Sequence, residues 1–272
     1  MWMAAFASSP WMEVVNIGSL GVASGRSGIM MEPDCWCRNH ALASLHGCGF
    51  WSWCGVDKEE GLRMAVIDPD TLERVANYRL LIGAVVPRPI AWITTVDAHG
   101  TVNLAPFSFF NGVTASPPTL MVSIGHRPQP KDTLANLRAN GQAVVHLVPD
   151  ALVAECHQSG GEYAPEVSET DVLGLALEPS LVVRPPRLQA ADVAFECTLD
   201  QEVAVGDPPA SVVFLRIVRA HIRDDLLQAD GLPDPERVRA LSRLGDRAYL
   251  RGSAWEVVHQ EKQHVPEAQR RR

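Results

Sequence analysis

From Arg88 onwards, short runs of β-branched and aromatic residues are separated by clusters of turn residues. Residues 88–96 form one such run, which ends at Asp97-Ala98-His99-Gly100. Extended sequence resumes over residues 101–105, so the two runs predict a hairpin. Further strands are predicted over residues 109–114, 119–125, 143–148, 193–205 and 211–222, the last two joined by Gly206-Asp207-Pro208-Pro209. Because helices do not alternate regularly with these strands, the pattern predicts a mainly β fold, a closed barrel with short helical excursions.

The helices predicted between these strands are short. Asp68-Pro69-Asp70 is typical of a helix start, and Asp132 is expected to cap a helix that ends near Asn140-Gly141. Two more helices are predicted over residues 151–157 and 235–241. Residues 159–170 are polar and contain glycine and proline, which predicts a loop.

The composition changes near Met64. Residues 1–63 show neither the two-residue apolar period of a strand nor the 3.6-residue apolar period of a helix. They nevertheless hold four of the six cysteines and five of the seven tryptophans. Two interpretations stay open. One is a zinc site, for which the candidate ligands are Cys35, Cys37, His40, His46, Cys48 and Cys54, without the usual C-x₂₋₄-C pairs. The other is upstream sequence read through in frame, with the natural start at Met64, Met30 or Met31. We therefore expect a non-native or disordered extension over 1–63, one domain over 64–255, and a polar tail over 256–272.

Composition and charge narrow the class of protein. With 46% hydrophobic residues the chain has enough apolar residues for an ordinary globular core, and its net charge of −8 does not favour a nucleic-acid partner. No apolar stretch approaches the ~18 residues of a membrane span, and the N-terminus lacks the basic region of a secretory signal. We expect a cytoplasmic protein with reduced cysteines.

Side-chain chemistry alone does not predict an enzyme. The chain has no G-x-G-x-x-G, G-x-x-x-x-G-K-[ST], H-E-x-x-H or G-x-S-x-G motif. Its histidines do not have metal-ligand spacing, and Cys156 and His157 are neighbours on a predicted helix, so they do not face each other. A cofactor would have to carry the chemistry.

The best candidate for a cofactor site is Lys131-Asp132-Thr133 at a predicted helix start. A helix N-terminus presents unpaired N–H groups and partial positive charge, to which Lys131 adds a cation and Thr133 a hydroxyl. Together these suit a phosphate monoester, although an ordinary capped surface helix explains the same residues. Ser108, Asn111 and Ser123 are further neutral donors.

The aromatic and threonine residues nearby have structural explanations too. Strand alternation places Phe107 and Phe109 on one face and Ser108 and Phe110 on the other, and the phenylalanines suit core or dimer contacts. Thr94 and Thr95 point to opposite faces of their strand, so at most one meets a given ligand through its side chain. Their β-propensity also explains their presence.

At these residues the sequence resembles the flavin reductase-like family of FMN-binding split barrels, which includes flavoredoxin-like proteins. The resemblance runs through residues 88–95, 103–111, Pro117-Pro118, 123–125, Lys131-Asp132-Thr133, Glu196-Cys197, Arg243-Leu244-Gly245 and Tyr249. It implies a homodimer of split Greek-key β-barrels, with FMN near the subunit interface. Asp246 departs from the second glycine that many relatives have, which puts the loop there in doubt.

The resemblance also implies which residues bind the cofactor. Along the flavin ring and ribityl chain it places Thr94, Thr95, Asn103, Ala105, Pro106, Phe107 and Ser108. Around the phosphate it places Ser108, Asn111, Ser123, Lys131 and Thr133, with Asp132 as a further cofactor-binding residue. It places Arg243 and Tyr249 near the cofactor or the nicotinamide entrance. The implied reaction is hydride transfer from NADH or NADPH to flavin. The reduced flavin then either leaves for a partner monooxygenase or reduces a second acceptor. Two alternatives are an FMN-dependent oxygenase or reductase that acts directly on an organic substrate, and a non-catalytic flavin-binding protein.

Overall fold

The structure, a computed structural model, describes residues 64–125 and 130–259. The zinc and read-through interpretations of residues 1–63 therefore lie outside the described residues, as does most of the predicted tail. The chain divides into two units after Ala65, and the architecture below is that of the second unit, which begins at Val66.

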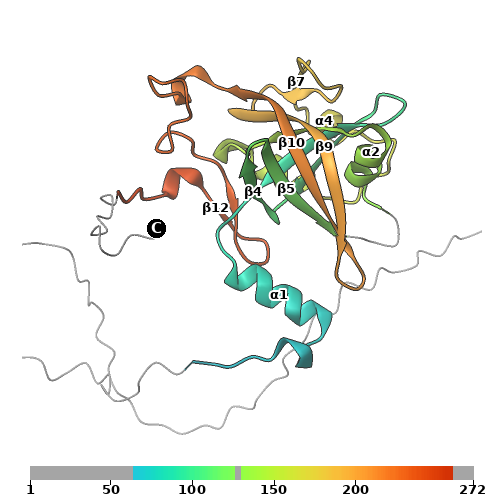
Figure 1. Cartoon of the computed structure of the whole chain (residues 1–272), viewed down its shortest axis with the longest axis vertical. Helices are drawn as coiled ribbons and strands as arrows, with labels where there is room; N and C mark the ends of the chain where they lie inside the picture. The colour runs from blue at the N-terminus through green and yellow to red at the C-terminus, as the bar shows by residue number, and fades with distance from the viewer. Residues whose placement is uncertain (1–63, 126–129, 260–272) are drawn as a thin grey trace, which may run out of the picture. The chain divides into compact units, whose positions relative to one another are not determined.

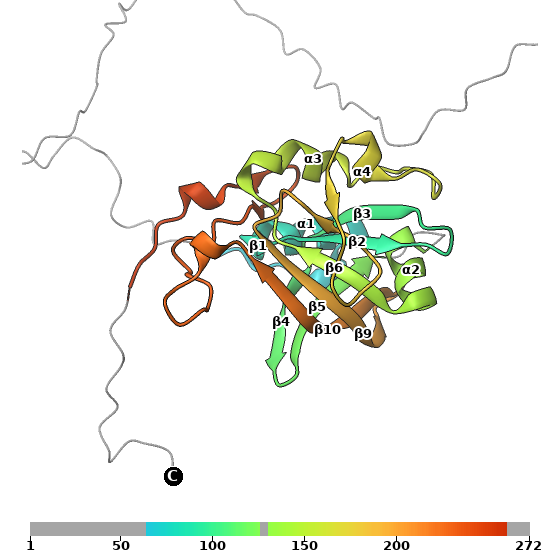
Figure 2. The ribbon, with the colours of Figure 1, turned by 90° about the horizontal axis from the view of Figure 1, so that it is seen from above.

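Seven strands form one antiparallel sheet (Figures 1 and 2). Their order across the sheet is β3 (Val102–Phe107), β2 (Ala91–Val96), β6 (Gln142–His146), β9 (Val193–Val205), β10 (Ala210–Ile222), β5 (Pro118–Gly125) and β4 (Phe110–Ala115). The two edge strands, β3 and β4, are joined by only Ser108 and Phe109, so the sheet must curl until its edges meet at that end. A curled sheet whose edge strands remain unpaired with each other is a split barrel, and this confirms the predicted fold.

The turn residues set the hairpins as the sequence predicts. In the β2–β3 turn, the Asp97 carboxylate accepts hydrogen bonds from the backbone N–H groups of His99 and Thr101, both at 2.8 Å. Gly100 has a φ of +96°, which few residues other than glycine adopt. Gly206, with a φ of +90°, turns the chain between β9 and β10. Both predicted hairpins are confirmed.

The remaining elements are short. A three-stranded sheet contains β1 (Arg88–Pro89), β11 (Ser242–Arg243) and β12 (Tyr249–Leu250), and β7 (Leu177–Glu178) pairs with β8 (Arg187–Leu188). The α-helices are α1 (Arg74–Ala84), α2 (Asp132–Asn140), α3 (Val153–Gln158) and α4 (Glu169–Val172). Four 3₁₀ turns are η1 (Pro69–Thr71), η2 (Asp150–Leu152), η3 (Asp224–Leu226) and η4 (Gly252–Ala254).

Three helix predictions need correction. The start at Asp68 makes only the turn η1, and α1 begins at Arg74. Lys131, not Asp132, is the N-cap of α2, because Asp132 is the first helical residue. The helix predicted over 235–241 is wrong. Asp234 holds a turn there through hydrogen bonds from Arg237 N and Val238 N, and the chain then extends until Leu241 N donates to Val148 O at 2.8 Å. Pairing with a distant segment therefore overrides the local helical preference.

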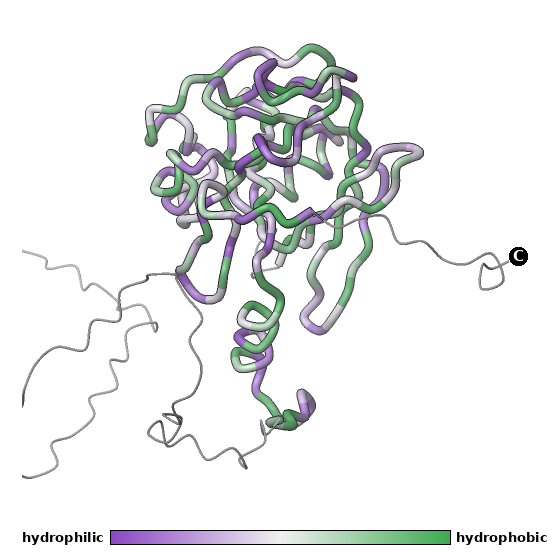
Figure 3. The backbone as a smooth tube through the Cα atoms, turned by 90° about the vertical axis from the view of Figure 1, so that its left-hand side faces the viewer, coloured by the Kyte–Doolittle hydropathy of each residue, from purple (hydrophilic) through white to green (hydrophobic). Residues whose placement is uncertain are grey.

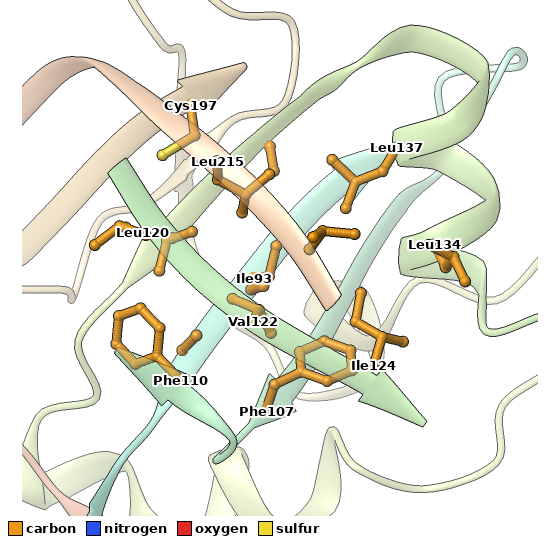
Figure 4. Close-up of a cluster of buried hydrophobic side chains, with 14 residues drawn as sticks. Ile93, Phe107, Phe110, Leu120, Val122, Ile124, Leu134, Leu137, Cys197 and Leu215 are labelled. Carbon is orange, nitrogen blue, oxygen red and sulfur yellow. The ribbon is translucent and has the colours of Figure 1, made fainter. Parts of the chain in front are cut away.

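One buried cluster fills the barrel (Figure 4), and it includes both Phe107 and Phe110. The predicted assignment of the phenylalanines to faces is wrong, because the chain turns a corner at Ser108-Phe109 rather than continuing as one strand. Phe109 lies outside the cluster, with its ring centroid 6.4 Å from that of Tyr78 and 5.9 Å from the Arg88 guanidinium. The predicted structural role of Phe107 and Phe110 in the core is confirmed.

Two buried titratable residues are satisfied by backbone groups. The Glu196 carboxylate accepts hydrogen bonds from the N–H groups of Leu181 (2.7 Å), Val182 (2.6 Å) and Val183 (3.0 Å), and lies 2.6 Å from His221 Nε2. His146 bonds Trp92 O through Nδ1 and accepts from Leu188 N through Nε2. Burial lowers the pKa of His146 to about 4, so the ring is neutral near pH 7. These contacts fasten the 181–188 segment onto the sheet.

Candidate functional site

A cavity of about 470 Å³ lies between the edge strand β3, the N-terminus of α2 and the segment 159–169. Of the residues predicted to bind a cofactor, it is lined by Asn103, Ala105, Pro106, Lys131, Asp132 and Thr133. The other wall contains Ser159, Gly160, Gly161, Glu162, Tyr163, Pro165 and Glu169. The structure thus brings together segments about 30 residues apart that the sequence associates with one ligand.

Hydrogen-bonded side chains hold Asn103 at the cavity wall. Asn103 Nδ2 donates to Thr133 Oγ1 at 2.9 Å and to Thr95 Oγ1 at 3.2 Å, and Asn136 Nδ2 donates to Thr95 Oγ1 at 3.1 Å. Thr95 is fully buried, whereas Asn103 and Thr133 line the cavity. Thr95 therefore positions Asn103 and α2 relative to each other and does not line the cavity itself.

The α2 N-terminus gives the cavity its positive end. The helix is nine residues long, and its first N–H groups, those of Asp132 and Thr133, have no acceptor in the preceding turn. Lys131 is the only lysine in residues 64–259. Its Nζ lies 5.2 Å from the centroid of the Phe107 ring, a cation–π distance that directs the side chain along β3. This end of the cavity is suited to an anion.

Glu169 is a cavity residue that the sequence reasoning missed. It is 5% exposed, and its Oε2 accepts a hydrogen bond from the Leu104 N–H at 2.8 Å. Burial raises the pKa of Glu169; the hydrogen bond from Leu104 opposes this effect and the charge of Asp132 adds to it. No spacing or motif in the predicted loop 159–170 distinguishes this glutamate, because its partner is 65 residues away.

The bond to Glu169 shows which backbone groups of β3 point outward. Since the Leu104 N–H faces Glu169, Leu104 and its cross-strand partner Thr94 form a pair without mutual hydrogen bonds. By alternation, Val102, Leu104 and Pro106 direct their backbone groups away from β2. Proline is compatible with such an edge position because it has no N–H to donate. Of these three residues, Pro106 lines the cavity.

The segment across the cavity is anchored to the barrel. Trp92 Nε1 donates to Ser159 Oγ at 2.8 Å, and Ser159 Oγ donates to Cys156 O at 3.0 Å. Trp92 and Cys156 are fully buried, and burial raises the pKa of the Cys156 thiol to about 12. Cys197 is fully buried too, and burial raises the pKa of its thiol to about 12. Neither thiol is a nucleophile at neutral pH.

A second, smaller cavity of about 50 Å³ is also lined by Pro106. It contains four more of the predicted residues, Phe107, Ser108, Arg243 and Tyr249. The Arg243 guanidinium lies over the Tyr249 ring at 4.5 Å and donates to its hydroxyl, which is 3.0 Å from His157 Nδ1. Arg243 and Tyr249 therefore line a compartment separate from the large cavity.

Thr94, Asn111 and Ser123 line neither cavity. Thr94 is fully buried, and its hydroxyl donates to Pro186 O at 2.7 Å on the face of β2 opposite that of Thr95. Asn111 is exposed on β4, where its side chain accepts from Gly112 N at 2.8 Å. The Ser123 N–H donates to Phe109 O at 2.8 Å, close to the corner between β3 and β4. These three residues have structural partners of their own.

Residues 64–125 and 130–259 contain no group of three His, Cys, Asp or Glu side chains that could hold a metal ion. No helix in the same ranges has the length and apolarity needed to cross a membrane.

Comparison with known proteins places this architecture in a family. The model of the flavin reductase like domain matches residues 82–242. An uncharacterized protein of Halalkalibacterium halodurans is 42% identical over 189 residues, which cover 67% of this chain and 90% of that protein. Nitrilotriacetate monooxygenase component B from Bacillus cereus has 30% identity and a TM-score of 0.68, and the match covers 75% of this chain and all of that one. The Pseudomonas fluorescens 2-nitrobenzoate 2-nitroreductase has 29% identity, the same TM-score and the same coverage. The chain therefore belongs to the flavin reductase-like family and shares its flavin-associated split-barrel fold.

Proposed function

We propose that the chain binds FMN in the large cavity and uses it to accept hydride from NADH or NADPH. The observation that carries the proposal is a single cavity with an anion-binding helix N-terminus at one end and an open strand edge along one side. Bound FMN would supply the hydride-transfer chemistry that the side chains lack. The protein contributes binding, orientation and exclusion of water.

The residues present fit the two chemical parts of FMN. The phosphate suits the N–H groups of Asp132 and Thr133 together with the Lys131 ammonium. The outward carbonyl of Pro106, which lines the cavity, is an acceptor suited to the imide N–H of the isoalloxazine ring. Glu169 holds the same strand edge through Leu104. The anchored segment around Tyr163 covers the opposite side, which limits access of water.

Rapid mixing with a nicotinamide donor tests the proposal. Full-length protein with excess FMN is expected to oxidise NADH or NADPH with turnover on the order of 1 s⁻¹ or faster. Protein without flavin and free FMN without protein are the controls. Tight FMN binding with no oxidation above these controls would contradict the reductase and support a non-catalytic flavin-binding protein.

The fate of the reduced flavin separates two enzyme classes. A reductase that releases it to a partner oxygenase is supported by the similarity to a protein named as component B of a monooxygenase. Direct reduction of an organic substrate is supported by the similarity to a nitroreductase and by the wall that residues 159–169 add to the cavity. In the first case, added free FMN is consumed as a substrate; in the second, one bound FMN per chain is sufficient.

The chain assembles as a homodimer through α1 in this proposal. Only Ile82 of α1 is buried, while Val75, Tyr78 and Leu81 are each more than half exposed, as is Val85 just beyond the helix. Figure 3 shows hydrophobic stretches along this helix, which extends away from the sheet. A cluster of exposed apolar side chains on a helix is typical of an interface, and a second copy offers a self-complementary partner.

We expect Leu81→Asp to raise the dissociation constant of the dimer by about tenfold or more, because a charge would be buried at the interface. Arg79→Glu, at an exposed polar position of the same helix, is the matched control. Light scattering over a dilution series measures both. A monomeric wild-type protein, or equal effects of the two substitutions, would contradict this role of α1.

A further inference from the structure

We infer that the small cavity beside Pro106 binds an oxyanion, a carboxylate or phosphate group, of the second ligand that meets the flavin. This inference rests on the proposed function, since it identifies the chemical class of the ligand that shares the site with FMN. It is carried by Arg243, which lines this cavity, and by Arg88, whose guanidinium lies behind Ser108. In the part of the chain that the structure describes, neither arginine has a carboxylate partner.

Arg88 supplies the first positive charge. It is 5% exposed, and its guanidinium donates to three neutral carbonyls, those of Ile82 (2.8 Å), Val85 (2.6 Å) and Leu244 (2.9 Å). Its Nε lies 3.4 Å from Ser108 Oγ, which lines the cavity. These contacts hold the guanidinium in place and leave its charge uncompensated.

Arg243 supplies the second positive charge. It pairs directly with Arg88 across β1 and β11, and its guanidinium donates to the Tyr249 hydroxyl and to Asp246 O. Within residues 64–125 and 130–259, neither arginine forms an ion pair with a carboxylate. Burial lowers the pKa of Arg88, and the charge of Arg243 lowers it further against the opposing effect of Tyr78. Two neighbouring like charges are costly, and a bound anion would relieve that cost.

The size and position of the cavity define the ligand. About 50 Å³ accepts a carboxylate- or phosphate-sized group but not a flavin ring. Ser108 and Tyr249 also line this cavity, so two neutral hydroxyl-bearing side chains accompany Arg243. Pro106 lines both cavities, so the two share one wall residue. In this proposal the anion belongs to a molecule whose remainder reaches the flavin cavity past Pro106. An aromatic or aliphatic acid and a nicotinamide nucleotide both offer such a group.

Isothermal calorimetry on the FMN-loaded, full-length protein tests this site with benzoate and inorganic phosphate as probes. Arg243→Gln is expected to weaken binding of at least one probe by about tenfold, as loss of a charge-assisted hydrogen bond predicts. Arg247→Gln removes the same charge from an exposed position on the same turn and is expected to have no effect. Arg243→Lys, which keeps the charge, is expected to recover part of the affinity, and melting curves show whether each variant is folded.

The outcomes distinguish an organic acid from a nicotinamide nucleotide as the source of the oxyanion. They also distinguish failure of the oxyanion site from failure of the proposed FMN binding. Loss of benzoate binding identifies an organic acid, and loss of phosphate binding together with a raised KM for NADPH identifies the nucleotide; either supports the oxyanion site. No binding of either probe to the wild type, or equal losses in Arg243→Gln and Arg247→Gln, overturns it. FMN affinity, measured separately by flavin fluorescence, is expected to be unchanged in Arg243→Gln. A wild-type protein that binds no FMN refutes the proposed function whatever the probes do.

Discussion

Replacement of Lys131 by alanine is expected to weaken FMN binding by about 10- to 100-fold, the effect of losing a charged hydrogen bond to phosphate. Riboflavin has the same ring and ribityl chain but no phosphate, so its affinity is expected to change by less than about twofold. The reason is that Lys131 lies at the α2 end of the large cavity, where the helix N–H groups also point.

Quenching of flavin fluorescence measures both affinities on the same protein. Arg216→Ala removes a positive charge from an exposed position of β10 and controls for the general field of the protein. Added salt is expected to weaken FMN binding in the wild type more than in Lys131→Ala. Equal losses for FMN and riboflavin would place the phosphate elsewhere and contradict the assignment of this end of the cavity.

The second large effect is expected from Glu196→Gln, which should lower the free energy of unfolding by about 3 kcal/mol at pH 7. The amide would direct an NH₂ group at backbone N–H groups that now donate to a carboxylate. Glu178→Gln is the matched control, because Glu178 forms a partly exposed ion pair with Arg187 and is worth less than about 1 kcal/mol. Urea unfolding followed by circular dichroism measures both.

The pH dependence of unfolding distinguishes the contribution of Glu196 to stability from that of His146, because the two are lost over different pH ranges. Burial alone would raise the pKa of Glu196, but the hydrogen bonds from Leu181, His221, Val182 and Val183 lower it to about 2. Its stabilisation is therefore complete above the unfolded pKa of 4.5 and is lost as the pH falls towards 2, about 3 kcal/mol in all. For His146 the loss occurs between pH 6.5 and about 4. Glu196→Gln should abolish the lower window and keep the upper one; loss of both would contradict this division.

The sequence predicts the sheet well where local chemistry decides the structure. The hairpins follow from Asp97, Gly100 and Gly206, whose turn conformations need those residue types. The predictions fail where distant segments compete. Residues 235–241 extend to pair with Val148, and the corner at Ser108-Phe109 turns both Phe107 and Phe110 inward. Strand alternation cannot anticipate a corner that arises from the closure of the barrel.

The candidate site likewise has residues that the sequence predicts and residues that only the folded structure reveals. Asn103 and Lys131-Asp132-Thr133 line one cavity, as the family resemblance implies, although about 30 residues and two strands separate them. Glu169 and Arg88 escape prediction, since their roles depend on Leu104 and Leu244, which only the folded chain brings near. The separation of Arg243 and Tyr249 from the large cavity is likewise a property of packing around Pro106.

The two-residue link between β3 and β4 has a consequence for ligand binding. Pro106 and Ser108 lie at or beside this link, and between them they contact both compartments. A movement of the backbone at Pro106 would change the wall of both compartments. Wherever occupancy of one compartment changes affinity in the other, thermodynamic reciprocity requires the influence to be equal in both directions.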